Sequence, residues 1–457
     1  MRGRAGAPRS AAAAAARLRR PPVQTPYGTP VQTPRGTDPM APSFAVHARR
    51  GAAALATAAV LGAAAAPAAF ADGSPSPAAP GLYGTKDPKF DGVFRQSLVL
   101  VAQGTTGLPD EAAVNWLADQ QCSDGGFAGY RADTGKACDP KAGEFTDATS
   151  AAVQGLAAAG GRSAAVQKGL DWLKGHQNED GGWGMTPGAA SDANSTSIAI
   201  GAFAAARQDP AKAVAKSGKS PYDALLSFQL GCDKKEDERG AFAYMPQKGE
   251  LQANDLASAA AALAALGKGF GAGAPKQGDK PVKPLECTGD ENAKPQDAEA
   301  AADAVAGYLA KKLDADGGQL KSSMPGAPEG PDFGATADAV IALAAGGHRE
   351  AAGKPLAWLE SKDSKTAEWA KGDPGRLAKL ILAAHTAGAD PRAFGGTDLV
   401  RQLADTAPKP QATATPQAKE EKKDGGSDSS RWWVLGAAFV ASVGVGILLS
   451  GRMKKKQ

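Results

Sequence analysis

The chain has 457 residues, of which 42% are hydrophobic and 22% are charged, enough for one large domain or two ordinary ones. Its net charge of +4 is unevenly distributed, because residues 1–50 hold nine Arg and one Asp, and residues 431–457 hold two Arg, three Lys and no acid. The other 38 basic and 47 acidic residues give residues 51–430 a net charge of −9, which argues against a nucleic-acid partner.

The N-terminal part of the chain has the composition of a processed leader. Residues 43–71 read SFAVHARRGAAALATAAVLGAAAAPAAFA, with a basic pair, an apolar run and a small-x-small cleavage site ending at Ala71. This order is typical of a secretory signal peptide, which we assign to residues 40–71. Because signal peptides begin at the N-terminus, we expect residues 1–39, with their tandem PVQTPYGT and PVQTPRGT, to be a start-site artefact or disordered. A linker at residues 72–90 follows.

Two alternating sets of helices are predicted along residues 91–405. The first set is Ala-rich and mostly starts at Asp or Asn, whose side chains cap the free amides of a first helical turn. These starts are Asp91, Asp147, Asn194, Asn254, Gly334 and Asp373. The second set is amphipathic and comprises Asp110–Gln120, Ala164–His176, Pro221–Leu230, Gln296–Leu313, Lys354–Glu360 and Gly396–Ala404.

The two sets differ in how much of their surface is apolar. Helices of the first set are apolar nearly all round and rich in small residues, which suits a closely packed inner ring. The amphipathic helices suit an outer ring with one face in water. An Ala-rich composition alone would produce apolar runs, but it would not make helix starts recur in register. The sequence therefore predicts an all-α domain of six helical hairpins in two concentric rings.

A glycine-rich turn follows the outer helices of the first repeats. Gln120–Tyr130 reads QQCSDGGFAGY and His176–Gly184 reads HQNEDGGWG, and weaker forms recur at Phe228–Met245 and Lys311–Met324. Glycine ends a helix at low cost because it adopts the left-handed conformation easily. We expect the aromatic residue after the glycines to pack back over the turn and hold consecutive repeats together.

Four cysteines, Cys122, Cys138, Cys232 and Cys287, fit an oxidising compartment. No Cys-x-x-Cys pair occurs and the chain has only four histidines, so we expect no metal site. Four cysteines allow three pairings. Of these we favour Cys122 with Cys138 and Cys232 with Cys287.

The C-terminal part of the chain predicts a membrane anchor. Residues 406–430 are rich in Pro, Ala, Lys and Glu and are expected to form a disordered tether. Residues 432–451, WWVLGAAFVASVGVGILLSG, carry no charge over a length that crosses a bilayer of ~30 Å as a helix. The basic tail at residues 452–457 is expected in the cytoplasm, which puts the body of this single-pass protein outside the cell. An LPxTG-type sorting signal is absent, so a retained span is favoured over attachment to the wall.

The segments WLADQQCSDGGF and WLKGHQNEDGGWG resemble the QW repeat of the squalene cyclase, or terpenoid cyclase, and protein prenyltransferase superfamily. In that repeat a Gln is followed by Gly-x-Trp or Gly-x-Phe. The resemblance covers Asp91 to about Ala404, is strongest in the first two repeats and is lost in the fifth, LESKDSKTAEW. It implies an (α/α)6 toroid, the squalene oxidase repeat fold.

In that superfamily the chemistry lies at the N-termini of the inner helices. The Asp-x-Asp-Asp-Thr of squalene cyclases has its best counterpart at Phe145–Thr149, which keeps one acid, Asp147, and the threonine. Because a helix N-terminus lowers the pKa of an acid, we expect Asp147 to act as a cap, with a catalytic acid as the weaker alternative. The Asp, Cys and His zinc triad of prenyltransferases and the thioester Cys-Gly-Glu-Gln are absent, which lowers the expectation of an enzyme.

Secreted toroids with disulfides resemble the large domain of the cobalamin carriers. This resemblance implies that the protein binds a small molecule, either a corrinoid or another compound. It implies no other cofactor. The carriers also have a β-rich domain, for which this chain has no room between Ala404 and the tether.

A ligand site is expected where parallel inner helices would bring six N-termini to one mouth. Their partial positive charge suits an anionic or carbonyl-rich group, although the acids at the rim offset it. For Tyr130, Trp183 and Tyr244, which follow the glycine turns, packing in the interior is the alternative role. The expected ligand-binding residues are Asp91, Asp147, Asn194, Asn254, Asp255, Thr336, Asp373, Tyr130, Trp183 and Tyr244.

Three functions remain open from the sequence. The first is a membrane-anchored extracytoplasmic protein that binds a small ligand or a transporter partner, as a surface receptor for uptake. The second is an enzyme like a terpene cyclase or a prenyltransferase. The third is a structural or adhesive surface module.

Overall fold

The structure is a computed structural model that describes residues 80–409, with gaps at 108, 140, 142, 276–277 and 323–329. Within these residues every regular element is a helix, which confirms the all-α prediction. The expected signal peptide, most of the tether, the apolar segment 432–451 and the basic tail lie outside the described residues. No helix in the described part of the chain has the length and apolar character that a membrane span requires.

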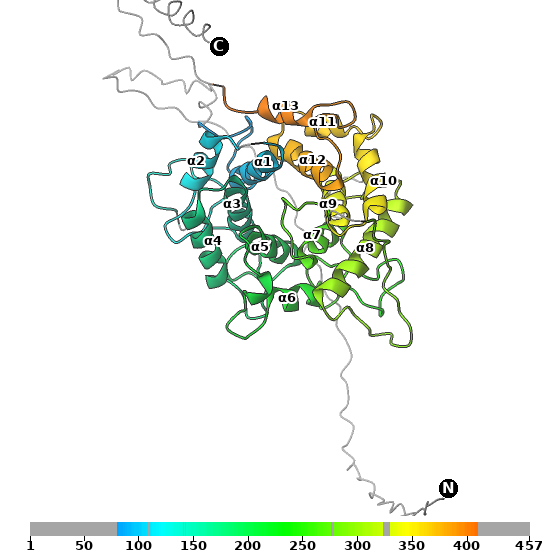
Figure 1. Cartoon of the computed structure of the whole chain (residues 1–457). Coiled ribbons are helices and arrows are strands. Elements are labelled where there is room, and N and C mark those ends of the chain that lie inside the picture. The colour runs from blue at the N-terminus through cyan, green and yellow to red at the C-terminus, as the bar shows by residue number, and fades with distance from the viewer. Residues whose placement is uncertain are drawn as a thin grey trace, which may run out of the picture. The chain divides into compact units, whose positions relative to one another are not determined.

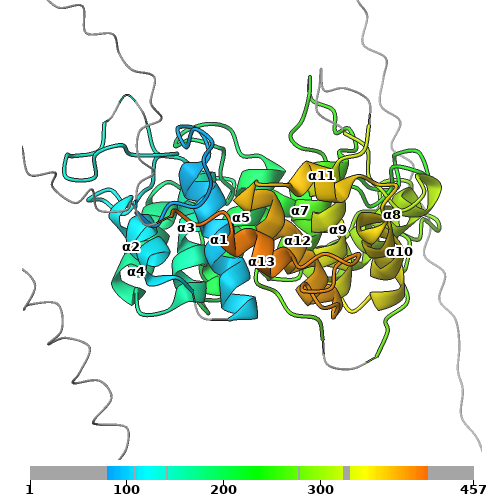
Figure 2. The ribbon, with the colours of Figure 1, turned by 90° about the horizontal axis from the view of Figure 1, so that it is seen from above.

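Six helices form an inner ring (Figure 1). Each contacts the next along the chain, and the last contacts the first, so that the ring is closed. Figure 2 shows the ring edge-on, with the helices running across its thickness. The inner helices are α1 (Gly92–Thr106), α3 (Thr146–Ala159), α5 (Ala193–Ala205), α7 (Asp255–Ala265), α9 (Phe333–Ala345) and α12 (Pro374–Ala387).

A second helix of each pair lies outside this ring (Figure 1). These helices are α2 (Glu111–Asp119), α4 (Ser163–Gly175), α6 (Pro221–Ser227), α8 (Ala298–Ala315), α10 (Arg349–Glu360) and α13 (Leu399–Ala404). Two short elements, η1 (Pro210–Lys212) and α11 (Thr366–Ala370), lie in connections. Helix α13 starts later than the predicted Gly396 because Gly395 and Gly396 both adopt positive φ. Helix α10 starts earlier than the predicted Lys354 and carries Pro355 inside it.

The composition of each ring explains its position. The inner helices bury almost all of their small side chains, as in α9, where most residues from Ala335 to Ala345 are buried. Small side chains allow inner helices to approach closely on both sides. The outer helices bury one face through large residues, such as Leu170, Trp172 and Leu173 of α4.

Two of the six inner helices are capped at the predicted residue. The side chain of Asn254 accepts from the Ala257 amide at the start of α7, and that of Asp373 accepts from the Arg376 amide at the start of α12. In α5 and α9 the cap lies two residues before the predicted start, at Asp192 and at Asp332 respectively. The predicted register was therefore right only to within about half a turn of helix.

Besides Asn194, two further residues predicted as caps make no capping hydrogen bond. Asp91 occupies the N-cap position of α1, but its carboxylate bonds no first-turn amide and pairs with Arg95 instead, at 3.1 Å. Asp147 is the second residue of α3, because the helix already begins at Thr146 after Phe145. Its side chain makes no capping bond at the start of α3 and instead accepts a hydrogen bond from the Ser195 hydroxyl of α5.

The glycine turns join neighbouring repeats. Gly125 and Gly181 adopt φ values of 106° and 93°. They do not end the preceding helices as the sequence predicted, because α2 already ends at Asp119 and α4 at Gly175. A Cβ atom at Gly125 would also overlap the carbonyl oxygen of Lys168 in α4, and one at Gly181 would overlap that of Ser220 before α6. Only glycine therefore permits this approach of consecutive outer helices.

The glutamine of the repeat completes the same junction. In the second repeat, Gln177 Nε2 donates to Gly181 O and to Ala213 O, both at 2.7 Å. Gln121 makes the equivalent pair of bonds in the first repeat, and Gln229 makes it in the third. One side chain thus fixes the turn and the following repeat together.

The residue after each glycine pair anchors the turn to an inner helix. The amide of Phe127 donates to Thr149 Oγ1 at 2.9 Å, and that of Trp183 donates to Thr196 Oγ1 at 3.1 Å. The same bond recurs between Leu320 and Thr336. The repeat motif of the sequence is therefore a set of buried bonds that holds the two rings in register.

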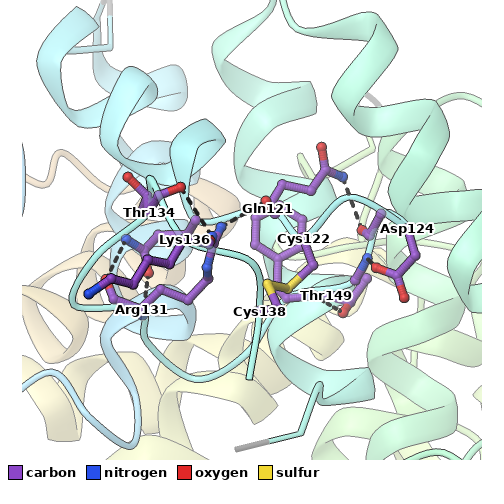
Figure 3. Close-up of a disulfide and its surroundings, with 12 residues drawn as sticks. Gln121, Cys122, Asp124, Arg131, Thr134, Lys136, Cys138 and Thr149 are labelled. Carbon is purple, nitrogen blue, oxygen red and sulfur yellow. Dashed lines mark hydrogen bonds between the residues drawn. A yellow bond between two sulfur atoms is a disulfide. The ribbon is translucent and has the colours of Figure 1, made fainter. Parts of the chain in front are cut away.

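Both predicted disulfides are confirmed. Cys122 is bonded to Cys138 and Cys232 to Cys287, with Cα–Cα distances of 5.7 and 5.6 Å. Figure 3 shows the first of them beside Arg131, whose guanidinium donates to the carbonyl oxygens of Thr134 and Lys136 within the closed loop and of Gln121 just before it.

Candidate functional site

A cavity of about 180 Å³ lies inside the inner ring, and all six inner helices contribute to its wall. We call it the lumen cavity. Most of its wall is aliphatic or aromatic, and the larger of these side chains are Phe94, Ile198, Leu256, Leu263, Phe270 and Ile341. A few polar side chains interrupt this surface, namely Asp147, Gln154, Asn194, Ser197, Lys268, Asp338 and Lys379. An apolar cavity with a few polar groups is the usual form of a small-molecule site.

Two polar side chains at the N-terminal ends of neighbouring helices face this cavity. Asp147 lies in the first turn of α3 and Asn194 in the first turn of α5. The Oδ1 atom of each is buried and has no hydrogen-bond partner among the described residues. Leaving a buried acceptor unpaired costs about 1–3 kcal/mol. The pair is therefore a site at which a bound donor would recover free energy.

The pKa of Asp147 is raised from 3.8 to about 6. Burial is the main cause, and the nearby carboxylate of Asp192 adds to it, whereas a hydrogen bond from the Ser195 hydroxyl opposes it. The sequence predicted a lowered pKa from the helix N-terminus. That prediction is wrong because the loss of water around the carboxylate outweighs the helix dipole.

An ion pair crosses the lumen wall between α9 and α12. Asp338 Oδ2 lies 2.7 Å from Lys379 Nζ, and the side chains are 19% and 22% exposed. Burial raises the pKa of Asp338, although the Lys379 ammonium acts in the opposite direction. Sequence reasoning missed both residues. The available signal was Asp338, the single charged residue of the otherwise mostly apolar helix α9, which is costly without a partner.

Asp91 and Asp373 lie at a second cavity, of about 340 Å³, near the N-terminal ends of α1 and α12. Asp373 Oδ2 lies 2.7 Å from Lys86 Nζ and 3.4 Å from Arg376 Nε. Burial acts to raise the pKa of Asp373, but the bonds from Lys86 and Arg376 outweigh it and lower this pKa. These two acids are therefore already paired with cations, unlike Asp147.

Three further residues predicted at the rim line neither cavity. Asn254 caps α7. Asp255 is buried and accepts a hydrogen bond from the Tyr308 hydroxyl of α8. The hydroxyl of Thr336 is used inside the protein, where it accepts from the Leu320 amide and donates to Asp332 O. Each of these polar groups has a structural partner.

The three aromatic residues predicted near the mouth pack against the protein. Trp183 is 1% exposed, and its Nε1 donates to Leu173 O at 2.8 Å. Tyr130 stacks on Trp116. Tyr244 is half-buried, and its pKa is raised by burial and by the carboxylates of Asp192 and Asp147, which places it near the acids of the site.

A group of metal-type side chains forms only at the first disulfide, within the part of the chain that the structure describes. Cys122, Cys138 and Glu144 approach one another there. The two sulfur atoms are bonded to each other, so they are not available as thiolate ligands.

Comparison with known proteins places these features in a family. The prenyltransferase alpha-alpha toroid domain matches residues 94–220 and 149–381 of the chain. A comparison with curated proteins gives no match.

Several solved structures are similar at low sequence identity. A protein from Actinoplanes is 16% identical, with 68% of this chain and 92% of that chain covered and a TM-score of 0.39. An ent-copalyl diphosphate synthase from Streptomyces platensis is 18% identical, with a TM-score of 0.39. That match covers 65% of this chain and spans half the length of the synthase. A glycosidase is 13% identical, with 68% and 91% covered and a TM-score of 0.37.

Proposed function

The chain belongs to the prenyltransferase alpha-alpha toroid family, and from this premise we propose that it is a membrane-anchored extracytoplasmic protein that binds a small amphipathic amine in its lumen cavity. The ligand has a cationic ammonium head and an apolar body. The head lies at Asp147 and Asn194, and the body lies along the aliphatic and aromatic wall.

The unpaired acceptors at one end of the cavity carry this proposal. A carboxylate with a pKa of about 6 is mostly ionised at neutral pH, and no cation pairs with Asp147 in the described residues. A buried carboxylate without a cationic partner is costly even though the Ser195 hydroxyl bonds it, so it favours a cationic ligand. Asn194 Oδ1 offers a second acceptor in the lining of the same cavity.

The caps of the helices explain why we propose a cation rather than the anion expected from parallel helix ends. Side chains of Asp192, Asn254, Asp332 and Asp373 already accept from first-turn amides of α5, α7, α9 and α12. One first-turn amide of each of these four helices is therefore occupied, and three of the four caps are acidic. These acidic caps make the electrostatic potential at the N-terminal ends of the inner helices less positive.

The volume of the cavity limits the ligand. About 180 Å³ is several times the ~30 Å³ of a water molecule but below the ~300–1,000 Å³ of sites for drug-sized compounds. A short aliphatic or single-ring body fits this volume, whereas a macrocycle as large as a corrinoid does not.

The second candidate function is an enzyme that uses Asp147 as a general acid or base. A pKa near the working pH favours this role, and the aromatic rings of Phe94 and Phe270 face the same cavity. Protonation of an alkene, the first step of squalene cyclisation, needs a much stronger acid than a carboxyl group with a raised pKa. Binding without reaction is therefore the function that we favour.

Membrane anchoring rests on the sequence of residues 40–71 and 432–451, and the two disulfides support an oxidising location. A protein held outside the membrane by a tether suits a receptor that passes its ligand to a transporter. A structural or adhesive surface module is the third candidate function, and the test below distinguishes it from the other two.

The test is to incubate the purified full-length protein with cell extract and to identify the bound small molecules by mass spectrometry. An unchanged amine that is retained by the wild type and by Asp119→Asn but lost from Asp147→Leu supports the proposal. Asp119 is the control because its carboxylate is exposed on α2. Chemical turnover of the molecule supports the enzyme, and the absence of any bound molecule supports the module.

A further inference from the structure

The segment that follows α7 runs across the C-terminal end of the inner ring. We call residues 267–273, GKGFGAG, the lumen plug. They begin the long connection to α8, which starts at Ala298. Four of these seven residues are glycines, a composition that is typical of a mobile loop.

Hydrogen bonds hold the lumen plug to three inner helices. Lys268 Nζ donates to Ala345 O at the end of α9, at 2.6 Å. The Phe270 amide donates to Gln154 Oε1 of α3, at 2.8 Å. Thr386 Oγ1 of α12 donates to Ala272 O, also at 2.8 Å. The plug is therefore anchored along its length rather than at one point.

Glycine contacts seat the plug against a fourth helix. The Cα atom of Gly269 lies against Gly201 of α5, and a Cβ atom added to Gly269 would lie 2.8 Å from Gly201 O and would overlap Gln154 Oε1. Such a contact has no room for a side chain. Gly273, at the other end of the plug, has nothing within 4 Å of an added Cβ atom.

Phe270 places its ring in the lumen cavity, where it meets Phe94 of α1 edge-on with ring centroids 6.1 Å apart. A separate cavity of about 500 Å³ lies beyond the plug, among the C-terminal ends of α1, α3 and α5. Gln154, Lys268 and Gly269 line both cavities. The plug thus divides one axial space into two compartments.

We propose that the lumen plug sets the maximum length of the ligand, with Phe270 as the residue against which the apolar body ends. This inference rests on the proposed function, since it concerns the ligand of the same cavity. A ligand body longer than the lumen cavity must displace the Phe270 ring. Without that ring, the body would extend into the cavity of about 500 Å³ beyond the plug.

The test measures the affinity of full-length protein for butylamine, hexylamine and decylamine by calorimetry. In the wild type we expect affinity to rise with chain length and then to fall sharply before decylamine. In Phe270→Ala the rise should continue, by about fourfold for each added methylene that is buried. Phe270→Leu should move the limit by a smaller amount.

A matched pair of glycine variants provides a second test that leaves Phe270 unchanged. Gly269→Ala should unseat the plug, speed hydrogen exchange at residues 267–273 and admit decylamine. Gly273→Ala makes the same chemical change where there is space, so it should match the wild type in both measurements. Melting curves of all variants identify any that fail to fold.

The outcomes separate this inference from the function on which it rests. If butylamine binds but the length limit is the same in the wild type, Phe270→Ala and Gly269→Ala, the plug proposal is wrong and the proposed function stands. If no amine binds to the wild type or to any folded variant, both are wrong.

Discussion

Asp338 of α9 and Lys379 of α12 form an ion pair, 2.7 Å long, in the wall of the lumen cavity. Each is a charged residue in a helix whose other buried residues are nearly all apolar. Such a pair adds little net stability, but removing one partner leaves the other uncompensated in the wall.

We predict that Lys379→Met lowers the free energy of unfolding by about 3 kcal/mol. The double variant Asp338→Leu/Lys379→Met should recover most of that loss, because it removes both charges. Urea unfolding of the wild type, both single variants and the double variant measures the coupling between the two residues. Equal stability of Lys379→Met and the wild type would show that the pair does not form.

The raised pKa of Asp147 means that the charge proposed to bind a cation lowers the stability of the fold. Its pKa of about 6 lies above the value of 3.8 for a free carboxyl group, so the folded state holds the proton more tightly than the unfolded state does. This contribution to stability is full below about pH 4 and is lost as the pH rises through about 6. At neutral pH, ionised Asp147 therefore costs on the order of 3 kcal/mol.

The variant Asp147→Asn should remove that cost. We expect it to be more stable than the wild type at pH 7 and to have nearly the same stability below about pH 4. Thermal unfolding over this pH range measures the difference. A variant that is less stable than the wild type at neutral pH would show that the ionised carboxylate does not destabilise the folded state.

The inner and outer rings were predictable from the sequence, because six apolar segments alternate with six amphipathic ones and the QW-type turns recur between them. The site was predictable only in part. Asp147 and Asn194 line the lumen cavity, whereas Asp91 and Asp373 line a different one. A helix start can be located to within a few residues, and at 3.6 residues per turn this error redirects a side chain.

Two other parts of the site could not be predicted because they depend on contacts between segments that are far apart in the sequence. The partners Asp338 and Lys379 are brought together by the packing of α9 on α12. The lumen plug has a glycine-rich sequence that is typical of a mobile loop, and its fixed conformation depends on Gln154, Ala345 and Thr386 from distant helices. Tertiary contacts of this kind leave no local pattern.

The glutamine of the repeat should be important for stability. Gln177→Ala leaves Gly181 O and Ala213 O without a donor and is expected to cost about 2 kcal/mol. Gln167→Ala is the control, since this glutamine is exposed on α4 and bonds other exposed side chains. Its effect should stay within about 0.5 kcal/mol. Similar losses for the two variants in urea unfolding would argue against the bridging role of Gln177.

The two disulfides should contribute unequally to stability. The bond between Cys122 and Cys138 closes a loop with a sequence separation of 16, and that between Cys232 and Cys287 closes one with a separation of 55. The loss of loop entropy in the unfolded chain predicts contributions of about 3 and about 4 kcal/mol. Unfolding of Cys122→Ala/Cys138→Ala and of Cys232→Ala/Cys287→Ala measures them. A larger loss of stability in Cys122→Ala/Cys138→Ala than in Cys232→Ala/Cys287→Ala would contradict the loop-entropy explanation.

The central claim is that ionised Asp147 holds a cationic head in the lumen cavity. The most direct test is the affinity of the full-length protein for butylamine as a function of pH, in the wild type and in Asp147→Asn. We predict that wild-type affinity is constant above about pH 6 and falls about tenfold for each pH unit below it, because protonation removes the charge. The variant should bind weakly at every pH. Butylamine binding with the same affinity and the same pH profile in both proteins would contradict the account.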